Sequence, residues 1–409
     1  MIKAPRGTHD ILPAEQPLLR HVTDAFADLA ERYGYRQITT PTIEHVELIE
    51  RTSGEGSDII QKEIYTLEDR SGRTLALRPE ATAAVARAYL EHGLHREPQP
   101  VKTYLIGQMF RYDRPQRGRY REFWQLNVEA MGSDDPALDA EVIQLYDELL
   151  RTLGIRRYWL ELNSIGDREC RPAYIERLNE WLDAHPDVLT PEVEQKRATS
   201  PLRVFDVKDT NVRAALEDAP KIGESLCDSC REHFEAVRGY LEAAGVEYRL
   251  EPALVRGLDY YTRTTFEFLG EALGAKDSIL GGGRYDYLIE QIGGHPTPGV
   301  GWAAGLERLL IQVQEEGATG GVEEPRTDVF FAFEDGARRE EIVGLMAELR
   351  RQGRSVDTDY AGRSLKGQLT QAGRLGAETT VIVRDGEALL RRTGAEDEVV
   401  PLDALEGRL

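Results

Sequence analysis

The length, composition and charge of this 409-residue chain indicate a globular protein of two or three domains. With 30% charged residues spread along the chain, no run of ~18 apolar residues remains for a membrane span, and the N-terminus has no apolar leader segment, so we expect a cytoplasmic protein. The net charge of −21 argues against a protein that holds nucleic acid by overall attraction, so any RNA contact must be local.

The N-terminal part of the chain predicts a helix, a short strand and then a second helix that begins with two polar residues. Residues 14–33 place apolar side chains at helical spacing and predict an amphipathic helix. The β-branched segment 37–49 contains Pro41 and predicts a short strand that leads into a helix. Further on, an Arg-Pro turn in LRPEATAAVAR places Glu80 and Thr82 at the start of another helix.

Two strong strand predictions follow, at 101–113 and 120–132, joined by the loop RPQRGR. Alternation in the second strand separates an apolar face (Trp124, Leu126, Val128, Ala130) from a polar face (Gln125, Asn127, Glu129). Such a polar face is either solvated or the floor of a site. Residues 111–121 hold five arginines against a single acid, and guanidinium groups bind phosphate in a bidentate way. The loop therefore favours a site for ATP or an RNA backbone over a solvated hairpin tip.

The rest of the chain predicts an insertion, a return to the first domain and a separate domain. Residues 168–250 have the pattern of charged amphipathic helices, and strand-like residues resume at 251–269. A glycine run at 280–294 lets backbone approach a ligand closely, and 299–313 predicts a strand that enters a helix. An exposed linker is expected at 317–327, followed by alternating strands and helices, which predict a small α/β domain with a largely parallel sheet.

The cysteines offer a weak metal signal. Cys170, Cys227 and Cys230 are too few for a disulfide framework. CDSC followed by His233 gives a C-x-x-C-x-x-H string that could suggest zinc, but a structural zinc site needs four ligands and the sequence shows no second cluster. We therefore favour a helix-end pair of thiols and predict no metal site.

Several long motifs resemble those of a known family. FRYDRPQRGRYREF with the strand after it resembles motif 2 of class II aminoacyl-tRNA synthetases, GVGWAAGLERLL resembles motif 3, and 37–49 resembles the dimer-forming motif 1. LVRGLDYYTRTTFEF and LGGGRYDYLIEQIGG resemble the two signature peptides of histidyl-tRNA synthetases. PRGTHDILP, LRPEATAAVARA and LNSIGD also match that family, so the resemblance covers essentially the whole chain.

The resemblance implies both a fold and an activity. The fold is α+β: a class II synthetase catalytic domain with an antiparallel sheet and flanking helices, formed by 1–167 and 251–318 around the helical insertion 168–250, plus a C-terminal α/β anticodon-binding domain at 327–409. The activity is histidine–tRNA ligation, in which L-histidine and ATP give histidyl-adenylate and pyrophosphate, and histidine then passes to the 3′ end of tRNA(His). Magnesium accompanies ATP, a homodimer is expected, and no DNA or membrane is involved.

Catalytic and ATP-binding roles transfer to matching arginines. The resemblance implies that Arg111 holds the α-phosphate of ATP, and that Arg256 lies near the attacking carboxylate, where other class II enzymes more often use a metal ion. Arg308 holds the far end of the triphosphate. Arg119 is open to an ATP or a tRNA role, and we assign it to ATP.

Histidine-binding and tRNA-binding roles follow in the same way. The resemblance implies that Glu80, also a catalytic residue, binds the substrate α-ammonium with Thr82 and Gln125. Glu129 and Tyr261 read the two imidazole nitrogens, so that other amino acids leave polar groups unpaired. The remaining assignments are Tyr260 and Tyr285 to the histidine pocket, with a core role as the alternative, and Arg114, Gln116, Arg117 and Arg121 to tRNA.

A competing hypothesis comes from a different functional class. The non-catalytic paralogue that serves as a regulatory subunit of ATP phosphoribosyltransferase shares this fold and a histidine-sensing pocket. That paralogue lacks the C-terminal domain and generally departs from the synthetase at the arginine of the RGLDYY peptide. Because this chain has both Arg256 and residues 327–409, we favour the synthetase.

Overall fold

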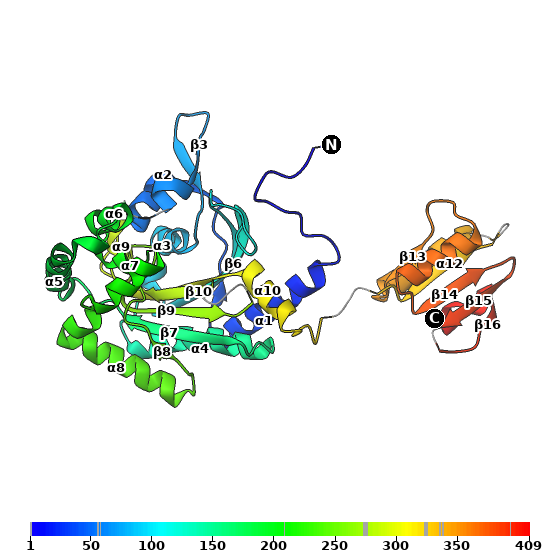
Figure 1. Ribbon diagram of the computed structural model, residues 1–409. Coiled ribbons are helices and arrows are strands. Elements are labelled where there is room, and N and C mark those ends of the chain that lie inside the picture. The colour runs from blue at the N-terminus through cyan, green and yellow to red at the C-terminus, as the bar shows by residue number, and fades with distance from the viewer. Residues whose placement is uncertain are drawn as a thin grey trace. The chain divides into compact units, whose positions relative to one another are not determined.

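The computed structural model describes residues 2–54, 57, 59–207, 209–272, 277–322, 326–334, 337, 339–392 and 394–409 (Figure 1). The chain divides into two compact units, Met1–Val322 and Glu323–Leu409, and this division falls inside the predicted linker. Among the described residues, no helix has the length and apolar character needed to cross a membrane.

An eight-stranded sheet forms the centre of the first unit, in the order β1-β5-β6-β11-β10-β9-β7-β8. The bounds are β1 Arg36–Gln37, β5 Val101–Phe110, β6 Glu122–Met131, β7 Tyr158–Ser164, β8 Arg249–Leu250, β9 Thr262–Gly270, β10 Asp277–Arg284 and β11 Gly299–Gly305. The long strands β5, β6, β11, β10, β9 and β7 pair antiparallel, and the short β1 and β8 pair parallel at the two edges. The predicted antiparallel sheet is confirmed.

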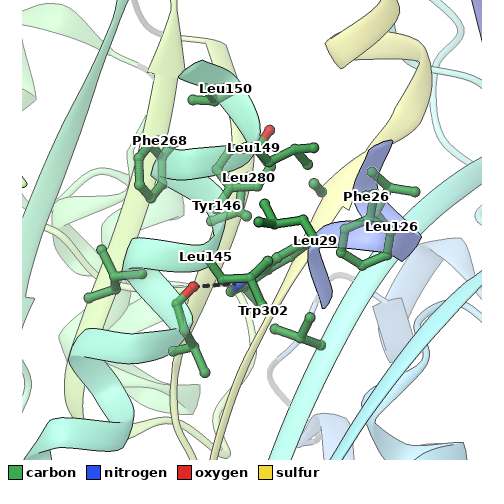
Figure 2. Close-up of a cluster of buried hydrophobic side chains, with 14 of the residues drawn as sticks. Phe26, Leu29, Leu126, Leu145, Tyr146, Leu149, Leu150, Phe268, Leu280 and Trp302 are labelled. Carbon is green, nitrogen blue, oxygen red and sulfur yellow. Dashed lines mark hydrogen bonds between the residues drawn. The ribbon is translucent and has the colours of Figure 1, made fainter. Parts of the chain in front are cut away.

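One face of this sheet carries the main hydrophobic core. The helices that contribute to it are α1 Gln16–Arg32, α4 Pro136–Thr152, α8 Asp228–Ala243 and α10 Leu306–Glu315. Figure 2 shows Trp302 of β11 between Phe26 of α1 and Tyr146 of α4, where its indole Nε1 donates a 2.8 Å hydrogen bond to the Val142 carbonyl. Leu126, Val128 and Ala130 of β6 join this core, as their alternation predicts.

The opposite face of the sheet is covered in part by α3 Thr82–Glu91 and α9 Leu288–Gln291. A second hydrophobic cluster joins Val85 of α3 and Leu288 of α9 to Leu105 of β5 and Tyr285. Before α3 the chain forms a three-stranded sheet of β2 Ile43–His45, β3 Tyr65–Glu68 and β4 Thr74–Leu77, with α2 Val46–Ser53 and the π-helix Ile59–Glu63 between β2 and β3. The short 3-10 helix Leu94–Arg96 follows α3.

The helical segment between β7 and β8 has a hydrophobic cluster of its own. It contains α5 Arg171–Ala184, α6 Pro191–Thr199, α7 Thr210–Ala215 and α8, with 3-10 helices at Pro186–Val188, Pro201–Phe205, Leu216–Asp218 and Ile222–Ser225. Tyr174, Leu178 and Cys230 lie in the local cluster, whereas Val237 and Leu241, further along α8, belong to the main core. The last helix therefore packs both within the segment and against the sheet domain.

The second unit is a mixed five-stranded sheet in the order β13-β12-β14-β15-β16. Its elements are β12 Val329–Phe333, α11 Arg339–Arg351, β13 Val356–Thr358, α12 Leu365–Arg374, β14 Thr379–Val383, β15 Glu387–Arg392 and β16 Glu398–Pro401, with 3-10 helices at Leu402–Ala404 and Glu406–Arg408. Strands β13, β12 and β14 are parallel as predicted, but β15 and β16 are antiparallel. The prediction of a largely parallel sheet is wrong here because the turn at 384–386 is too short for a parallel crossover.

Candidate functional site

A cavity of about 370 Å³ lies on the face of the large sheet opposite the main core. Segments far apart in the sequence contribute to its wall, from the π-helix Ile59–Glu63 to the first turn of α10. The predicted site residues that line it are Glu80, Thr82, Arg111, Arg119, Gln125, Arg256, Tyr260, Tyr261, Tyr285 and Arg308. The structure therefore brings together the residues predicted for ATP and nearly all of those predicted for histidine.

Glycines on two neighbouring strands make room for the side chains of the cavity. Gly301 of β11 pairs with Glu129 of β6, and a Cβ atom at Gly301 would lie 2.2 Å from the Glu129 carboxylate. On β10, a Cβ atom at Gly281 would lie 1.7 Å from the Arg256 guanidinium. The glycine run was expected to let backbone approach a ligand. In the structure these two positions instead accommodate protein side chains that reach into the site.

Glu129, the one predicted histidine-binding residue outside the cavity lining, lies directly behind Thr82 and Tyr285, whose hydroxyl groups hold it. Thr82 Oγ1 donates a 2.6 Å hydrogen bond to Oε1, and the Tyr285 hydroxyl donates to Oε2. The residue is 2% exposed, and within the part of the chain that the structure describes no ion pair involves it. Burial raises the pKa of Glu129 to about 8, because the low-dielectric interior penalises the carboxylate more than two hydrogen bonds stabilise it.

Glu80 and Gln125 add further polar atoms beside Glu129. The Glu80 carboxylate accepts hydrogen bonds from the backbone N–H groups of Thr82 (2.7 Å) and Ala83 (2.9 Å), and so satisfies donors at the start of α3. Burial raises the pKa of Glu80 above its usual value. The buried Oε1 of Gln125 has no hydrogen-bond partner among the described residues. A ligand donor in the cavity would satisfy this oxygen.

Three arginines from three different elements reach the same cavity. Arg111, directly after β5, donates from Nε to the Pro79 carbonyl at 2.8 Å and lies 5.5 Å from the centre of the Phe123 ring. Arg308, in the first turn of α10, donates from Nε to the Gly118 carbonyl at 2.9 Å. Both guanidinium groups are therefore fixed in place by backbone carbonyls.

Arg256 is the third of these arginines, and it precedes β9. Its Nη1 pairs with Glu267 Oε1 at 2.8 Å, while its buried Nε has no partner among the described residues. Although burial opposes ionisation, the charge of Glu267 raises the pKa of Arg256, so the guanidinium stays charged. An anionic ligand would meet a permanent cation here.

The loop between β5 and β6 borders the cavity. A backbone bridge between Gln116 and Arg119 closes its tip, and Arg119 pairs with Asp113 at 3.3 Å, both of which line the cavity. Arg114, Gln116 and Arg117 are exposed outside the lining, and Arg117 pairs with Glu315 of α10.

Arg121, at the end of the same loop, packs against other residues of the protein rather than extending into solvent. Its guanidinium stacks 3.6 Å from the centre of the Tyr112 ring, and its side chain packs against Gly7. Of the four residues predicted for tRNA, it is the one most engaged by the protein itself.

Sequence reasoning missed several residues that line the cavity. Glu267 alternates with the core residues Phe266 and Phe268 in β9, so its place on the polar face was a readable signal. Arg203 and Asp206 come from the helical segment between β7 and β8, and no local pattern marks them. Their presence shows that this segment contributes directly to the wall of the site.

The cysteines lie outside this cavity, and Cys227 and Cys230 form a pair of thiols at the start of α8, as predicted. Ligand atoms of Asp167, Cys170, Cys227 and Cys230 all lie within 4.8 Å of one another. His233, which belonged to the C-x-x-C-x-x-H string, turns away and contacts Asp139 at 3.2 Å. The second pair of potential ligands, which the sequence did not show, is supplied by Asp167 and Cys170.

This fold and cavity define the class of the protein. An antiparallel sheet that presents arginines from the loop between β5 and β6 and from α10 is the catalytic architecture of class II aminoacyl-tRNA synthetases. A family model described as histidyl-tRNA synthetase matches residues 7–168 and 176–309. The histidine–tRNA ligase of Halothermothrix orenii is 43% identical over 412 residues, covering 99% of this chain and 98% of that protein. The chain belongs to the histidyl-tRNA synthetase family.

A further relative and two solved structures are similar to this chain as well. The histidine–tRNA ligase of Desulforamulus reducens is 45% identical over 383 residues, covering 94% of this chain and 91% of its own. The crystal structure of apo histidyl-tRNA synthetase from S. aureus is similar with a TM-score of 0.83 and 35% identity, covering 100% and 99% of the two chains. A Bacillus halodurans structure described as an ATP phosphoribosyltransferase regulatory subunit/histidyl-tRNA synthetase has a TM-score of 0.60 at 23% identity, covering 89% and 94%, and this likeness shows the fold alone.

Proposed function

We propose a division of roles within the cavity for histidine–tRNA ligation, the activity of the family to which the chain belongs. The observation that supports it most directly is the distribution of charge around one cavity. Buried carboxylates with hydroxyl and amide oxygens lie near the start of α3 and along β6, while Arg111, Arg256 and Arg308 converge from other elements. Histidine offers a hydrogen-bonding imidazole at one end and, at the other, a cationic ammonium beside the carboxylate that must meet a phosphate.

In the first step, a carboxylate oxygen of histidine attacks the α-phosphorus of ATP, and the bond to pyrophosphate breaks. Negative charge grows on the α-phosphoryl oxygens as the two anions approach each other. Arg111 and Arg256, both fixed before the reaction, stabilise that charge without any reorganisation of solvent. In the second step, the terminal ribose hydroxyl of tRNA attacks the histidyl carbonyl, and AMP leaves.

The histidine pocket follows from the network around Glu129. Thr82 and Tyr285 donate their hydroxyl protons to Glu129, so their oxygen lone pairs stay available to accept from the substrate. We assign Glu80, Thr82 and Gln125 to the α-ammonium, and Glu129 with Tyr261 to the imidazole nitrogens. Tyr260 and Tyr285 complete the wall, with Tyr260 and Tyr261 ring centres 4.5 Å apart. A substrate lacking the second ring nitrogen would leave a buried polar group unpaired.

ATP would occupy the arginine-rich part of the cavity. Arg308 and Arg119 are assigned to the outer phosphates, and the ring of Phe123 beside Arg111 offers a surface on which a purine base can stack. The carboxylates of Asp113 and Glu307 line the same space, and such oxygen donors fit Mg²⁺ brought in with the nucleotide. The ion would neutralise charge on the β- and γ-phosphates.

Contacts with tRNA are assigned to the exposed loop and to the second unit. Arg114, Gln116, Arg117 and Arg121 lie on the loop that borders the cavity, so an acceptor stem bound there would place its end near the adenylate. The unit Glu323–Leu409 would bind the anticodon. A cytoplasmic homodimer completes the proposal.

The test is histidine-dependent exchange of labelled pyrophosphate into ATP, run with each of the twenty amino acids. We expect exchange with histidine alone, and a loss of ~10²–10³-fold in Arg256→Ala, the usual cost of removing one preorganised charge. Arg114→Ala is the matched control, because it removes an exposed arginine outside the cavity: it should keep exchange and weaken only tRNA charging. Folded protein that binds histidine without any exchange would overturn the proposal in favour of a regulatory, histidine-sensing role.

A further inference from the structure

Four potential metal ligands meet outside the catalytic cavity, from two segments about sixty residues apart. Asp167 and Cys170 lie between β7 and α5, and Cys227 and Cys230 lie at the start of α8. The Cys170 and Cys230 sulfurs are 3.9 Å apart, and Asp167 Oδ1 lies 3.7 Å from the Cys170 sulfur and 4.0 Å from the Cys227 sulfur. Each segment thus contributes a pair of ligands with two residues between them.

These spacings fit a tetrahedral metal ion. With Zn–S bonds of about 2.3 Å and a Zn–O bond of about 2.0 Å, tetrahedral geometry separates two sulfurs by roughly 3.8 Å and a sulfur from an oxygen by roughly 3.5 Å. The three separations above exceed these values by at most about half an ångström, and the remaining pairs of ligand atoms lie within 4.8 Å. Small side-chain rotations would therefore place all four atoms around one ion. A disulfide between Cys170 and Cys230 would require a much larger approach of the two sulfurs.

The backbone around Asp167 and Cys170 is already shaped for such a site. Gly166 has φ +61°, and a Cβ atom there would lie 2.5 Å from the Cys170 sulfur, so glycine leaves space for that sulfur. The backbone N–H of Asp167 donates to the same sulfur at 3.3 Å, which stabilises a thiolate. Arg263 donates to Asp167 Oδ2 at 3.3 Å and leaves Oδ1 directed at the sulfurs. A ligand carboxylate held by an outer partner is typical of protein metal sites.

Burial also favours a bound ion over an empty cluster of thiols. Asp167 is 5% exposed, Cys170 6% and Cys230 fully buried, whereas Cys227 is partly exposed and offers a route for entry. Arg263 compensates the charge of Asp167 through Oδ2 alone, so Oδ1 remains a buried anionic donor beside the thiols. Three thiolates and one carboxylate provide the soft donors and the closed four-ligand set of a structural zinc site, with no position left for water or substrate.

We propose that Asp167, Cys170, Cys227 and Cys230 bind one Zn²⁺ ion with a structural role. The ion joins the segment after β7 to the first turn of α8, so it fastens the helical segment to the sheet at both ends of its hydrophobic cluster. The neighbouring Arg171 donates to the Ile165 carbonyl at 2.9 Å and to the Tyr261 carbonyl. The site therefore supports the backbone next to the catalytic cavity. This inference does not depend on the roles proposed for the cavity.

The test is metal analysis of the full chain purified under reducing conditions without added metal, followed by cobalt exchange. We expect one zinc per chain, and after exchange the absorption bands of tetrahedral Co²⁺ with thiolate ligands. Cys227→Ser, at the partly exposed position, should lose most of the zinc, and Asp228→Asn, an exposed neighbour, should keep it. Asp167→Cys should slow zinc release to a chelator by ~10-fold or more, because thiolate is the softer ligand.

Several outcomes would overturn the proposal. The first is folded wild-type protein that contains well below one zinc per chain and also fails to take up added Zn²⁺ or Co²⁺. The others are equal zinc content in Cys227→Ser and Asp228→Asn, and a Cys170–Cys230 disulfide in the freshly reduced protein. Because cobalt spectra are read on the wild-type chain, the test stands even if a cysteine variant misfolds.

Discussion

Two buried carboxylates of this protein are contacted by consecutive residues of the chain, yet they occupy opposite electrostatic environments. The Tyr285 hydroxyl donates to Glu129 beside the cavity. Arg284, one residue earlier, donates from Nε to both oxygens of Asp139 at 3.1 Å, and both side chains of this pair are fully buried. Asp139 thus has a cationic partner within the protein, whereas Glu129 has hydroxyl partners alone among the described residues.

The pKa values express this difference. Burial opposes ionisation of Asp139, but the charge of Arg284 and the hydrogen bonds from Arg284 and His233 outweigh it and lower the pKa of Asp139 to about 2. Burial without a cation raises the pKa of Glu129 to about 8. A buried acid that the protein pairs internally stabilises the fold, whereas one left without a cation is suited to receive a cationic or hydrogen-donating ligand.

The largest effect on stability is expected from breaking the buried ion pair between Asp139 and Arg284. Asp139→Asn removes the closer of the two carboxylates that pair with the buried Arg284 guanidinium and leaves Asp286 as its remaining counter-charge, so it should lower the free energy of unfolding by ~3 kcal/mol. Urea denaturation at neutral pH measures this, with the exposed Asp134→Asn as control. A loss below ~1 kcal/mol would show that water or a neighbouring acid compensates Arg284.

Substitution of Glu129 should change stability less than substitution of Asp139, but it should clearly weaken histidine binding. Glu129→Gln keeps the shape of the side chain but cannot ionise when a cationic ligand binds, so histidine affinity should fall by ~10–100-fold, the contribution of a hydrogen bond to a charged group. Calorimetric titration of histidine measures this, with the exposed Glu232→Gln of α8 as control. Unchanged affinity would remove Glu129 from the histidine pocket.

The third prediction concerns how the free energy of unfolding depends on pH, and the change expected per pH unit is the smallest of the effects predicted here. Because the folded-state pKa of Glu129 lies above its usual value of 4.5, its stabilising contribution is complete below about pH 4.5 and is lost as pH rises towards 8. Glu129→Gln should therefore gain stability relative to the wild type across this window, by up to ~1.4 kcal/mol per pH unit.

Asp139 should show the opposite dependence. Its folded-state pKa lies below its usual value of 3.8, so its contribution is present above that pH and is lost as pH falls towards 2. Unfolding curves of the ligand-free protein between about pH 2 and pH 9 measure the pH dependence of both contributions. A difference between wild type and Glu129→Gln that stays constant with pH would contradict the assigned environment of Glu129.

The sequence alone was sufficient where the determinants are local or lie in long motifs. Alternation in 120–132 predicted which side of β6 faces the core, because side chains of a strand alternate regardless of what packs on them. The motifs around Arg111, Arg256 and Arg308 predicted the family, and the structure brings these three arginines to one cavity. Glu80 and Thr82 were likewise predicted at a helix start, where the structure has them.

Tertiary structure decided what depends on contacts between distant segments. The pairing of Arg256 with Glu267, the contribution of Arg203 to the cavity and the antiparallel β15 and β16 leave little or no local signal. The cysteines show the reason most clearly. CDSC alone offers too few ligands for zinc, and the missing pair, Asp167 and Cys170, reaches it because β7 and α8 pack against neighbouring parts of one sheet domain. Sequence spacing fixes neighbours along the chain, whereas burial of apolar faces fixes which distant side chains meet.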